Sequence, residues 1–284
     1  MSYNRIIFER KIKEFLEEDS NFKDVSSQFI PPEAITSAKI KAKSNGYVSG
    51  LEEIEILFNY LNVQIECKKK DGDAVKKGEI LAELKGNVRN ILRGERVGLN
   101  ILMHMSAITS TTRTYIEKIK ESGAKIKIAC TRKTIPGIRI FEKKAVELGG
   151  GDPHRFSLDD MILLKDTHLK YYNGDIRKLL SDVKEKASFS KKVEIEIEKV
   201  EDVIIAAQNG ADIIMLDNMT PQQVIDALSL LKKNSLRDKV ITEVSGNVTL
   251  ENFADYLKTE VDIISTSELT QFPSKSLDVS LRFD

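Results

Sequence analysis

Two short stretches of the chain concentrate cationic side chains around two of its three histidines. The first is "TRK", which follows the apolar run "KIKIAC", and the second is "GGGDPHR" with "LLKDTHL" shortly after it. Guanidinium and ammonium groups bind carboxylates and phosphates, and Arg does so through two parallel hydrogen bonds. A glycine triplet lets the backbone approach a ligand closely. The pattern predicts an anion-binding site that uses Arg132, Lys133, His154, Arg155 and Lys165.

Acidic and small hydroxyl side chains end four further apolar runs. Glu196 lies in "VEIEIE" and Asp217 ends "DIIMLD". Mg²⁺ is usually bound by one or two protein carboxylates together with phosphates of the substrate. Glu196 and Asp217 are therefore candidate metal ligands. Main-chain N–H groups at a turn into a helix suit phosphate. The candidate phosphate-binding residues are Ser245, Gly246, Asn247, Thr266 and Ser267. Together the two sets predict a phosphorylated substrate with Mg²⁺.

The elements that must position these residues alternate between strand and helix. Helix-like segments separate six short β-branched runs, which lie at 125–132, 161–166, 193–198, 212–218, 240–247 and 261–267. Such alternation predicts parallel strands with helical crossovers. Six units favour an open β/α barrel over residues 109–267, with a doubly wound open sheet as the alternative. In a β/α barrel the carboxyl ends of the strands meet at one mouth, and the polar residues named above end the runs.

Residues 1–108 have a different rhythm. A helical segment at 6–16 precedes alternating segments, which Asn-Gly and Asp-Gly turns separate, and a long helical pattern follows. This part of the α/β chain is expected to form an amino-terminal α/β sandwich, with the tail 268–284 packing back on it. His104, inside the long helical pattern, is expected in the core or at an interface.

Composition narrows the class of protein. Lys+Arg and Asp+Glu number 44 each, which argues against nucleic acid as a partner. Cys67 and Cys130 have neither a metal-ligand spacing nor a disulfide framework. The charged amino terminus is unlike a signal peptide, and the apolar runs are shorter than a membrane span. A cytoplasmic protein without a membrane partner is therefore expected.

Longer motifs carry a resemblance that runs nearly from end to end of the chain. They are "GERVGLNIL", "TRKTIPGIRIFEKKAVELGGGDPHR", "LLKDTHL", "EIEIE", "IIMLDN" and "LDVSLRF". With these motifs the chain resembles the quinolinate phosphoribosyltransferase family. The resemblance implies transfer of phosphoribose from phosphoribosyl pyrophosphate to quinolinate, which releases pyrophosphate and CO₂ and gives nicotinate mononucleotide. It also implies Mg²⁺, a homodimer, and an amino-terminal sandwich joined to an open β/α barrel.

The resemblance assigns roles to individual residues. Arg132, Lys133, His154, Arg155 and Lys165 match residues that bind the quinolinate carboxylates and neighbouring phosphates. Arg96, in "GERVGLN", matches an arginine that reaches the site of the partner subunit. Glu196 and Asp217 match acidic residues that position metal and ribose. The residues expected to be catalytic are Lys133, Lys165, Glu196 and Asp217.

Three alternatives stay open at this point. The sequence departs from the usual family pattern at Pro153, Thr167, Asn247, Ser267 and Gln271. A related phosphoribosyltransferase that acts on another carboxylated base is therefore the first alternative. A Schiff-base barrel lyase that uses Lys165 is the second. The third is a carrier module, because "CKKKDGDAVKKGEILAELKG" resembles a biotinyl- or lipoyl-type hairpin but has no attachment turn.

Overall fold

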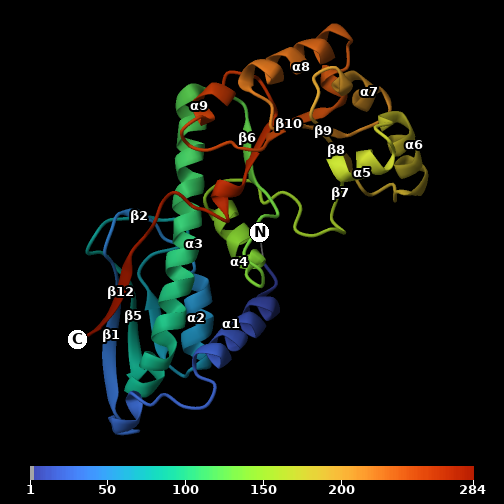
Figure 1. Ribbon diagram of the computed structural model, residues 1–284. Coiled ribbons are helices and arrows are strands. Elements are labelled where there is room, and N and C mark those ends of the chain that lie inside the picture. Colours follow the sequence, from blue (N-terminus) through green and yellow to red (C-terminus); the bar gives the residue numbers. More distant parts are fainter. Residues whose placement is uncertain (1–2) are drawn as a thin grey trace. The chain divides into compact units, whose positions relative to one another are not determined.

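All six β-branched runs form strands of one parallel sheet (Figure 1). The strands are β6 (Lys127–Cys130), β7 (Ile162–Leu164), β8 (Val193–Ile197), β9 (Ile213–Asp217), β10 (Ile241–Ser245) and β11 (Ile263–Thr266). Their order in the sheet is β6-β11-β10-β9-β8-β7. A doubly wound sheet would reverse its strand order near the middle, whereas here the order is sequential from β7 to β11. The expected open β/α barrel fold is confirmed, with β6 and β7 at the two open ends.

Helices connect these strands, and their ends follow sequence signals. They are α5 (Asp166–Tyr171), α6 (Ile176–Lys186), α7 (Asp202–Gln208), α8 (Pro221–Lys233) and α9 (Phe253–Tyr256). The side chain of Asp175 accepts the N–H of Lys178 at 3.0 Å, and α8 begins with a capping box between Thr220 and Gln223. In α8 a buried apolar face of Val224, Ala227, Leu228 and Leu231 packs inward. In Figure 1 these helices lie on the outer side of the strands.

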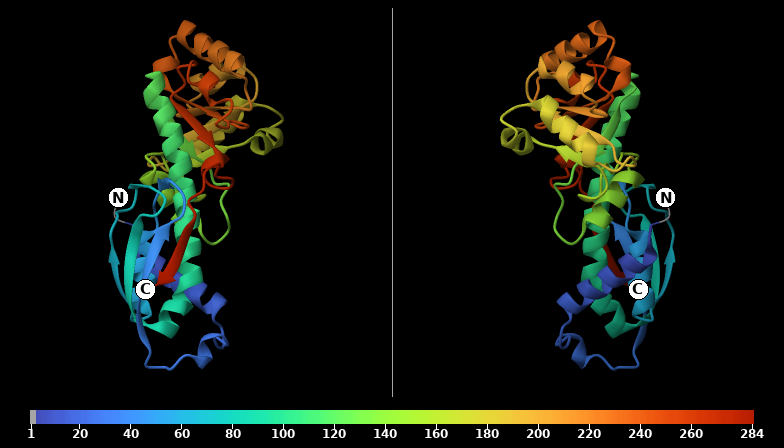
Figure 2. Two further views of the ribbon diagram at one scale, coloured as in Figure 1. Left: turned by 90° about the vertical axis from the view of Figure 1, so that its left-hand side faces the viewer. Right: turned by 90° about the vertical axis from the view of Figure 1, so that its right-hand side faces the viewer.

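The computed structural model describes residues 3–284. Their contacts divide them into two units. The first contains the chain up to residue 113, residues 140–149 and residues 273–284, and the second contains residues 114–139 and 150–272. Helix α3 (Val88–Ser122) contributes to both units and is continuous in both views of Figure 2. Helix α4 (Arg139–Leu148), which the sequence analysis assigned to the barrel segment, groups with the first unit except for Arg139.

The first unit is built on an antiparallel sheet in the order β12-β1-β5-β3. These strands are β1 (Ile35–Ala42), β3 (Gln64–Cys67), β5 (Ile80–Asn87) and β12 (Val279–Phe283), and a separate pair joins β2 (Gly46–Tyr47) to β4 (Ala74–Val75). In Figure 1 the last strand, β12 (red), lies beside β1 (blue). The stretch that resembles a carrier module, residues 67–86, runs from the end of β3 through β4 and most of β5, and β3 pairs with β5 inside this sheet. This stretch is therefore a structural part of the sheet.

Helices of the first unit pack closely because small residues face large ones. The helices concerned are α1 (Arg5–Asp19), α2 (Leu51–Tyr60) and α3. A Cβ added at Gly94 would lie 2.8 Å from side chains of Leu57, Phe58 and Leu61, so only glycine fits at this contact. The same turn of α3 leaves Arg96 exposed. His104 is half-buried and contacts the buried carboxylate of Glu142 at 3.1 Å. Among the described residues, no helix is long and apolar enough to cross a membrane.

Candidate active site

A pocket of about 460 Å³ lies where the strands of the second unit end. All six strands of the sheet, β6 to β11, and the loops next to them contribute to its wall. The lining residues are Cys130, Thr131, Arg132, Lys133, His154, Arg155, Leu163, Lys165, Glu196, Met215, Asp217, Asn218, Glu243, Ser245, Gly246, Asn247 and Ser265. The pocket therefore brings together five cationic or imidazole residues, two acidic residues and three loop residues that the sequence analysis singled out separately.

Two guanidinium groups give the pocket its anion-binding character. Arg132 and Arg155 both line the pocket, and burial and then the charge of Arg132 lower the pKa of Arg155. Arg155 Nη1 donates to the carbonyl oxygen of Met161 at 3.3 Å. The buried Nε of Arg132 has no hydrogen-bond partner among residues 3–284. Since a buried donor without an acceptor is costly, this arrangement suits an incoming carboxylate or phosphate.

His154 adopts an unusual backbone conformation in this wall. Its φ is +52°, a left-handed value that is uncommon for residues other than glycine. The side chain of Asp152 stabilises this turn by accepting the N–H of His154 at 2.8 Å. The two ring nitrogens of His154 face Arg155 and Glu243, so this residue contacts its neighbours on both sides. Backbone strain of this kind is typical of functional sites.

Lys165, Glu196 and Asp217 occupy three consecutive strand ends. Lys165 follows β7, and its Nζ forms an ion pair with the Glu196 carboxylate on β8. Asp217 ends β9, where burial and then the charge of Glu198 raise the pKa of its carboxyl group. Lys165 and Lys133 oppose this rise, so the acidic and cationic sides of the pocket influence each other electrostatically. His168 lies outside the pocket wall, because its Nδ1 accepts the N–H of Lys165 at the start of α5.

The loop after β10 has two consecutive left-handed residues. Gly246 has a φ of +89° and Asn247 a φ of +55°. A Cβ at Gly246 would lie 2.2 Å from the side-chain oxygen of Asn218, so glycine is required both by conformation and by space. A tight turn of this kind can present backbone N–H groups to an anion. This geometry suits the phosphate-binding role expected of Ser245, Gly246 and Asn247.

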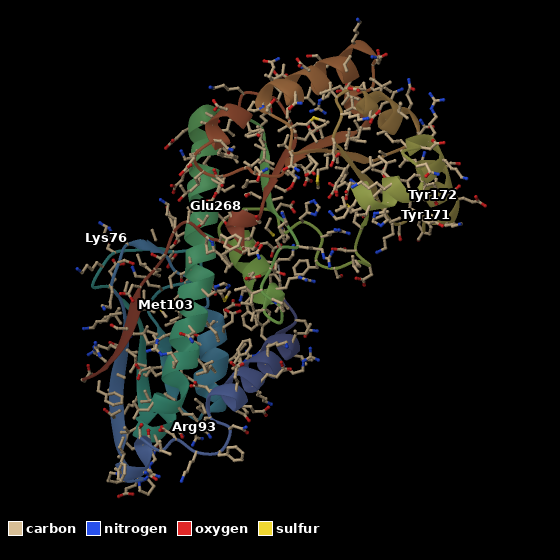
Figure 3. The ribbon with its side chains drawn as sticks, viewed as in Figure 1. Lys76, Arg93, Met103, Tyr171, Tyr172 and Glu268 are labelled. Atoms are coloured by element: carbon tan, nitrogen blue, oxygen red, sulfur yellow. The ribbon has the colours of Figure 1, made fainter. Side chains whose placement is uncertain are left out.

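Two of the expected phosphate-binding residues lie elsewhere. Within residues 3–284, the pocket wall does not include Thr266 or Ser267. Thr266 Oγ1 donates to the carbonyl oxygen of Val248 at 2.6 Å, so its hydroxyl stabilises the protein interior. The neighbouring Glu268, labelled in Figure 3, accepts hydrogen bonds from Tyr115 Oη and from the N–H of Leu250. These contacts connect the loop after β11 to the loop after β10.

Sequence reasoning missed two glutamates, Glu243 in the pocket wall and Glu194 close to it. Glu194 on β8 and Glu243 on β10 are fully buried, and each has a side-chain oxygen within 4.8 Å of the other and of a His154 ring nitrogen. Burial and then the charge of Glu243 raise the pKa of Glu194 to about 8. Each glutamate precedes a pocket residue, Glu196 or Ser245, by two positions and therefore points to the same face of the sheet. The available signal was the two-residue spacing of these glutamates from Glu196 and Ser245.

Comparison with known proteins gives the same family over both parts of the chain. The family model "Quinolinate phosphoribosyl transferase, C-terminal domain" matches residues 108–282, and the corresponding N-terminal domain model matches residues 24–106. A probable carboxylating nicotinate-nucleotide pyrophosphorylase of Archaeoglobus fulgidus is 45% identical over 251 residues, which cover 88% of this chain and 95% of that protein. The carboxylating nicotinate-nucleotide pyrophosphorylase of Rattus norvegicus is 34% identical over 94% of this chain and 88% of that protein.

Solved structures agree with the sequence comparison. The crystal structure of NadC from Streptococcus pyogenes superposes with a TM-score of 0.91 at 34% identity and covers 100% of this chain and 99% of that chain. The nicotinate-nucleotide pyrophosphorylase from Francisella tularensis superposes equally well, with a TM-score of 0.91 at 33% identity, and covers 100% of this chain and 98% of that chain. With the fold, the pocket and both domain matches in agreement, the chain belongs to the quinolinate phosphoribosyltransferase family.

Proposed function

We propose that the pocket of about 460 Å³ is where this chain carries out the reaction of its family. That reaction transfers phosphoribose from phosphoribosyl pyrophosphate to quinolinate, releases pyrophosphate and CO₂, and gives nicotinate mononucleotide in NAD synthesis. The observation that carries the proposal is that four cationic side chains, the carboxylates of Glu196 and Asp217, and the loop with the left-handed Gly246 line one pocket.

Quinolinate has two adjacent carboxylates, and the cationic wall suits them. Burial and then the charge of Arg132 lower the pKa of Arg155, and the buried Nε of Arg132 has no protein acceptor among the described residues. A dianion that lies between the two guanidinium groups offsets their mutual repulsion and accepts a hydrogen bond from Arg132 Nε. Lys133 and Lys165 extend the same wall toward the acidic strand ends. The cations therefore orient the pyridine ring with its nitrogen toward the ribose.

Ribose and pyrophosphate suit the opposite wall. As pyrophosphate departs, positive charge builds at the anomeric carbon, and the carboxylates of Glu196 and Asp217 stabilise it. The loop Ser245–Asn247 binds a phosphate through backbone N–H groups. After the new N-glycosidic bond forms, the ring nitrogen is cationic and stabilises the electron pair that CO₂ leaves on the neighbouring carbon. A proton then takes the place of CO₂.

Mg²⁺ fits the acidic side of the pocket. Glu196 and Asp217 end neighbouring parallel strands, and few protein carboxylates are what Mg²⁺ requires when phosphates supply its other ligands. When bound, the ion would neutralise charge on the pyrophosphate leaving group. A homodimer, in which Arg96 of each copy completes the partner's pocket, is also part of the proposal. The exposed position of Arg96 on α3 is compatible with this role.

One assay tests the proposal directly. Purified protein is incubated with phosphoribosyl pyrophosphate, Mg²⁺ and either quinolinate or nicotinate, and nicotinate mononucleotide and CO₂ are quantified. Quinolinate should give both products in equal amounts, while nicotinate should be a poor acceptor because it offers one carboxylate to a wall built for two. Comparable turnover of nicotinate, or no product from quinolinate, contradicts the assignment.

The alternative of a Schiff-base lyase is not needed to explain Lys165, because its Nζ forms an ion pair with Glu196.

A further inference from the structure

A chain of hydrogen bonds runs along the pocket wall from Arg155 to Ser245. The main-chain N–H of Arg155 donates to His154 Nδ1 at 2.8 Å, and His154 Nε2 lies 3.1 Å from Glu243 Oε2. The second oxygen of Glu243 accepts the hydroxyl of Ser265 at 2.6 Å, and Ser265 Oγ lies 3.0 Å from Ser245 Oγ. Glu243 is fully buried and lies at the centre of this chain. It therefore connects the residue expected to bind carboxylate with the loop expected to bind phosphate.

The protons of this hydrogen-bond chain can be assigned from the groups at its two ends, the main-chain N–H of Arg155 and the hydroxyl of Ser245. A main-chain N–H can only donate, so His154 Nδ1 must be an acceptor and the ring proton must lie on Nε2. Nε2–H then donates to the Glu243 carboxylate. Ser265 has one hydroxyl proton, which it gives to Glu243, so Ser245 donates to Ser265 in turn. Each oxygen of Glu243 thus accepts one hydrogen bond.

We propose that Glu243 is a positioning residue that fixes His154 in the Nε2–H tautomer, so that Nδ1 holds the main-chain N–H of Arg155 and sets its guanidinium in the pocket. The effect on catalysis rests on the function proposed above, whereas the tautomer itself does not. His154 needs this support because its backbone is held at a φ of +52°. Without an acceptor at Glu243, the imidazole is free to rotate away from Arg155.

A metal ion at the same cluster is the main competing idea. His154, Glu194 and Glu243 offer ligand atoms within 4.8 Å of one another. Metal coordination through Nε2 would require that nitrogen to be unprotonated and would move the proton to Nδ1. Nδ1 would then meet the N–H of Arg155, donor against donor. The hydrogen bond of 2.8 Å between these atoms favours the positioning role.

The tautomer can be measured in the substrate-free protein. The chain has three histidines, so long-range ¹H–¹⁵N spectra of histidine-labelled protein can be assigned with the variants His104→Ala, His154→Ala and His168→Ala. We expect the Nε2–H pattern for His154 in the wild type. An Nδ1–H pattern, which a metal on Nε2 would also require, overturns the proposal whether or not quinolinate is the substrate.

Substitutions at Glu243 separate positioning from simple packing. Glu243→Met fills a similar volume without a hydrogen-bond acceptor, so it should abolish the single tautomer of His154. It should also raise the quinolinate KM about tenfold to a hundredfold, because a displacement of a binding group by about 1 Å can have an effect of this size. Glu243→Gln keeps one acceptor for His154, and its amide can donate to Ser265, whose hydroxyl then donates to Ser245. Glu243→Gln should therefore keep the Nε2–H tautomer and rescue most of the KM.

The matched control is Glu194→Gln. Glu194 is equally buried in the same cluster, but neither of its oxygens has a hydrogen-bond partner among residues 3–284. This variant should keep the tautomer and a KM within about twofold of wild type, because it removes no hydrogen bond. In a double-mutant cycle, Glu243→Met should add little to His154→Ala, because both act through one group. Equal effects of Glu243→Met and Glu194→Gln, or additive effects in the cycle, overturn the proposal.

Discussion

Asn247 Nδ2 donates a hydrogen bond of 3.0 Å to Asn218 Oδ1, and this contact joins the loop after β10 to the end of β9. Asn218 Nδ2 in turn donates to Asp217 Oδ2 at 2.8 Å. The candidate phosphate loop is therefore connected to the candidate metal ligand through one amide side chain. A change on either side of Asn218 is expected to affect the other.

Gly246→Ala tests this connection from the loop side. The added Cβ would lie 2.2 Å from Asn218 Oδ1, and alanine is strained at a φ of +89°. We expect the KM for phosphoribosyl pyrophosphate to rise by about tenfold or more, together with a loss of stability of about 1–3 kcal/mol for such backbone strain. Steady-state kinetics and thermal unfolding measure the two effects.

Asn247→Gly provides the control for that variant. Asn247 has a φ of +55°, which glycine adopts without strain, so this change removes the hydrogen bond to Asn218 and little else. A single neutral hydrogen bond contributes about 1 kcal/mol, which predicts a KM increase of about fivefold at most. If Gly246→Ala has no larger effect than Asn247→Gly, the loop does not contact phosphate in the way proposed.

Asp217→Asn tests the acidic role. The substitution keeps the shape of the side chain at the end of β9 and removes its charge. If Asp217 holds Mg²⁺ and stabilises the ribose cation, turnover at saturating Mg²⁺ should fall by about a hundredfold, or about 3 kcal/mol. Asp226→Asn, at an exposed position on α8, is the control and should leave turnover unchanged. Turnover of Asp217→Asn within about twofold of wild type would falsify this role.

Arg155→Ala tests the carboxylate contact. Removing one partner of a desolvated ion pair costs about 2–5 kcal/mol, so quinolinate affinity should fall by about thirtyfold or more. The affinity for phosphoribosyl pyrophosphate should change much less, because the loop Ser245–Asn247 is intact. Equilibrium binding of each substrate separates the two effects. An unchanged quinolinate affinity means that Arg155 does not bind a carboxylate.

Subunit mixing tests the role of Arg96. Arg96→Ala and Lys165→Ala should each be nearly inactive if Arg96 completes the partner's pocket. A mixed dimer contains one pocket with both wild-type residues, so mixing should restore up to about half of the activity per mixed dimer. Subunit exchange is verified by native mass spectrometry. Exchange without recovery would indicate that Arg96 acts within its own chain.

The sequence predicted the sheet and most of the pocket because strand and site residues share local signals. β-Branched runs with polar ends such as Lys165 and Asp217 predict both a parallel strand and its catalytic end. Thr266 has the same local pattern, yet its hydroxyl bonds to Val248, a contact that only the tertiary structure determines. Glu243 went unrecognised because a glutamate two positions before a strand end is read as an exposed residue unless the fold buries that face.

Glu53 in the first unit is far more buried than a glutamate usually is. Its side chain is 1% exposed, Oε1 lies 2.7 Å from Lys144 Nζ, and Oε2 has no hydrogen-bond partner among the described residues. Burial raises the pKa of Glu53 from 4.5 to about 7, although Lys144 opposes the rise. The folded state therefore binds this proton more tightly than the unfolded state does. Stability from this group is full below pH 4.5 and is lost as the pH rises through about 7.

Glu53→Gln should remove that pH dependence. The rise in the pKa of Glu53 from 4.5 to about 7 corresponds to about 3 kcal/mol of unfolding free energy. The wild type should therefore lose about this much stability relative to Glu53→Gln as the pH rises across this range. Urea unfolding at several pH values from 4.5 to 8 measures it. Glu52→Gln is the matched control, because Glu52 contacts the same Lys144 at 2.5 Å but is 71% exposed. If both variants change the pH profile equally, the effect comes from the surface charge of the pair and not from burial of Glu53.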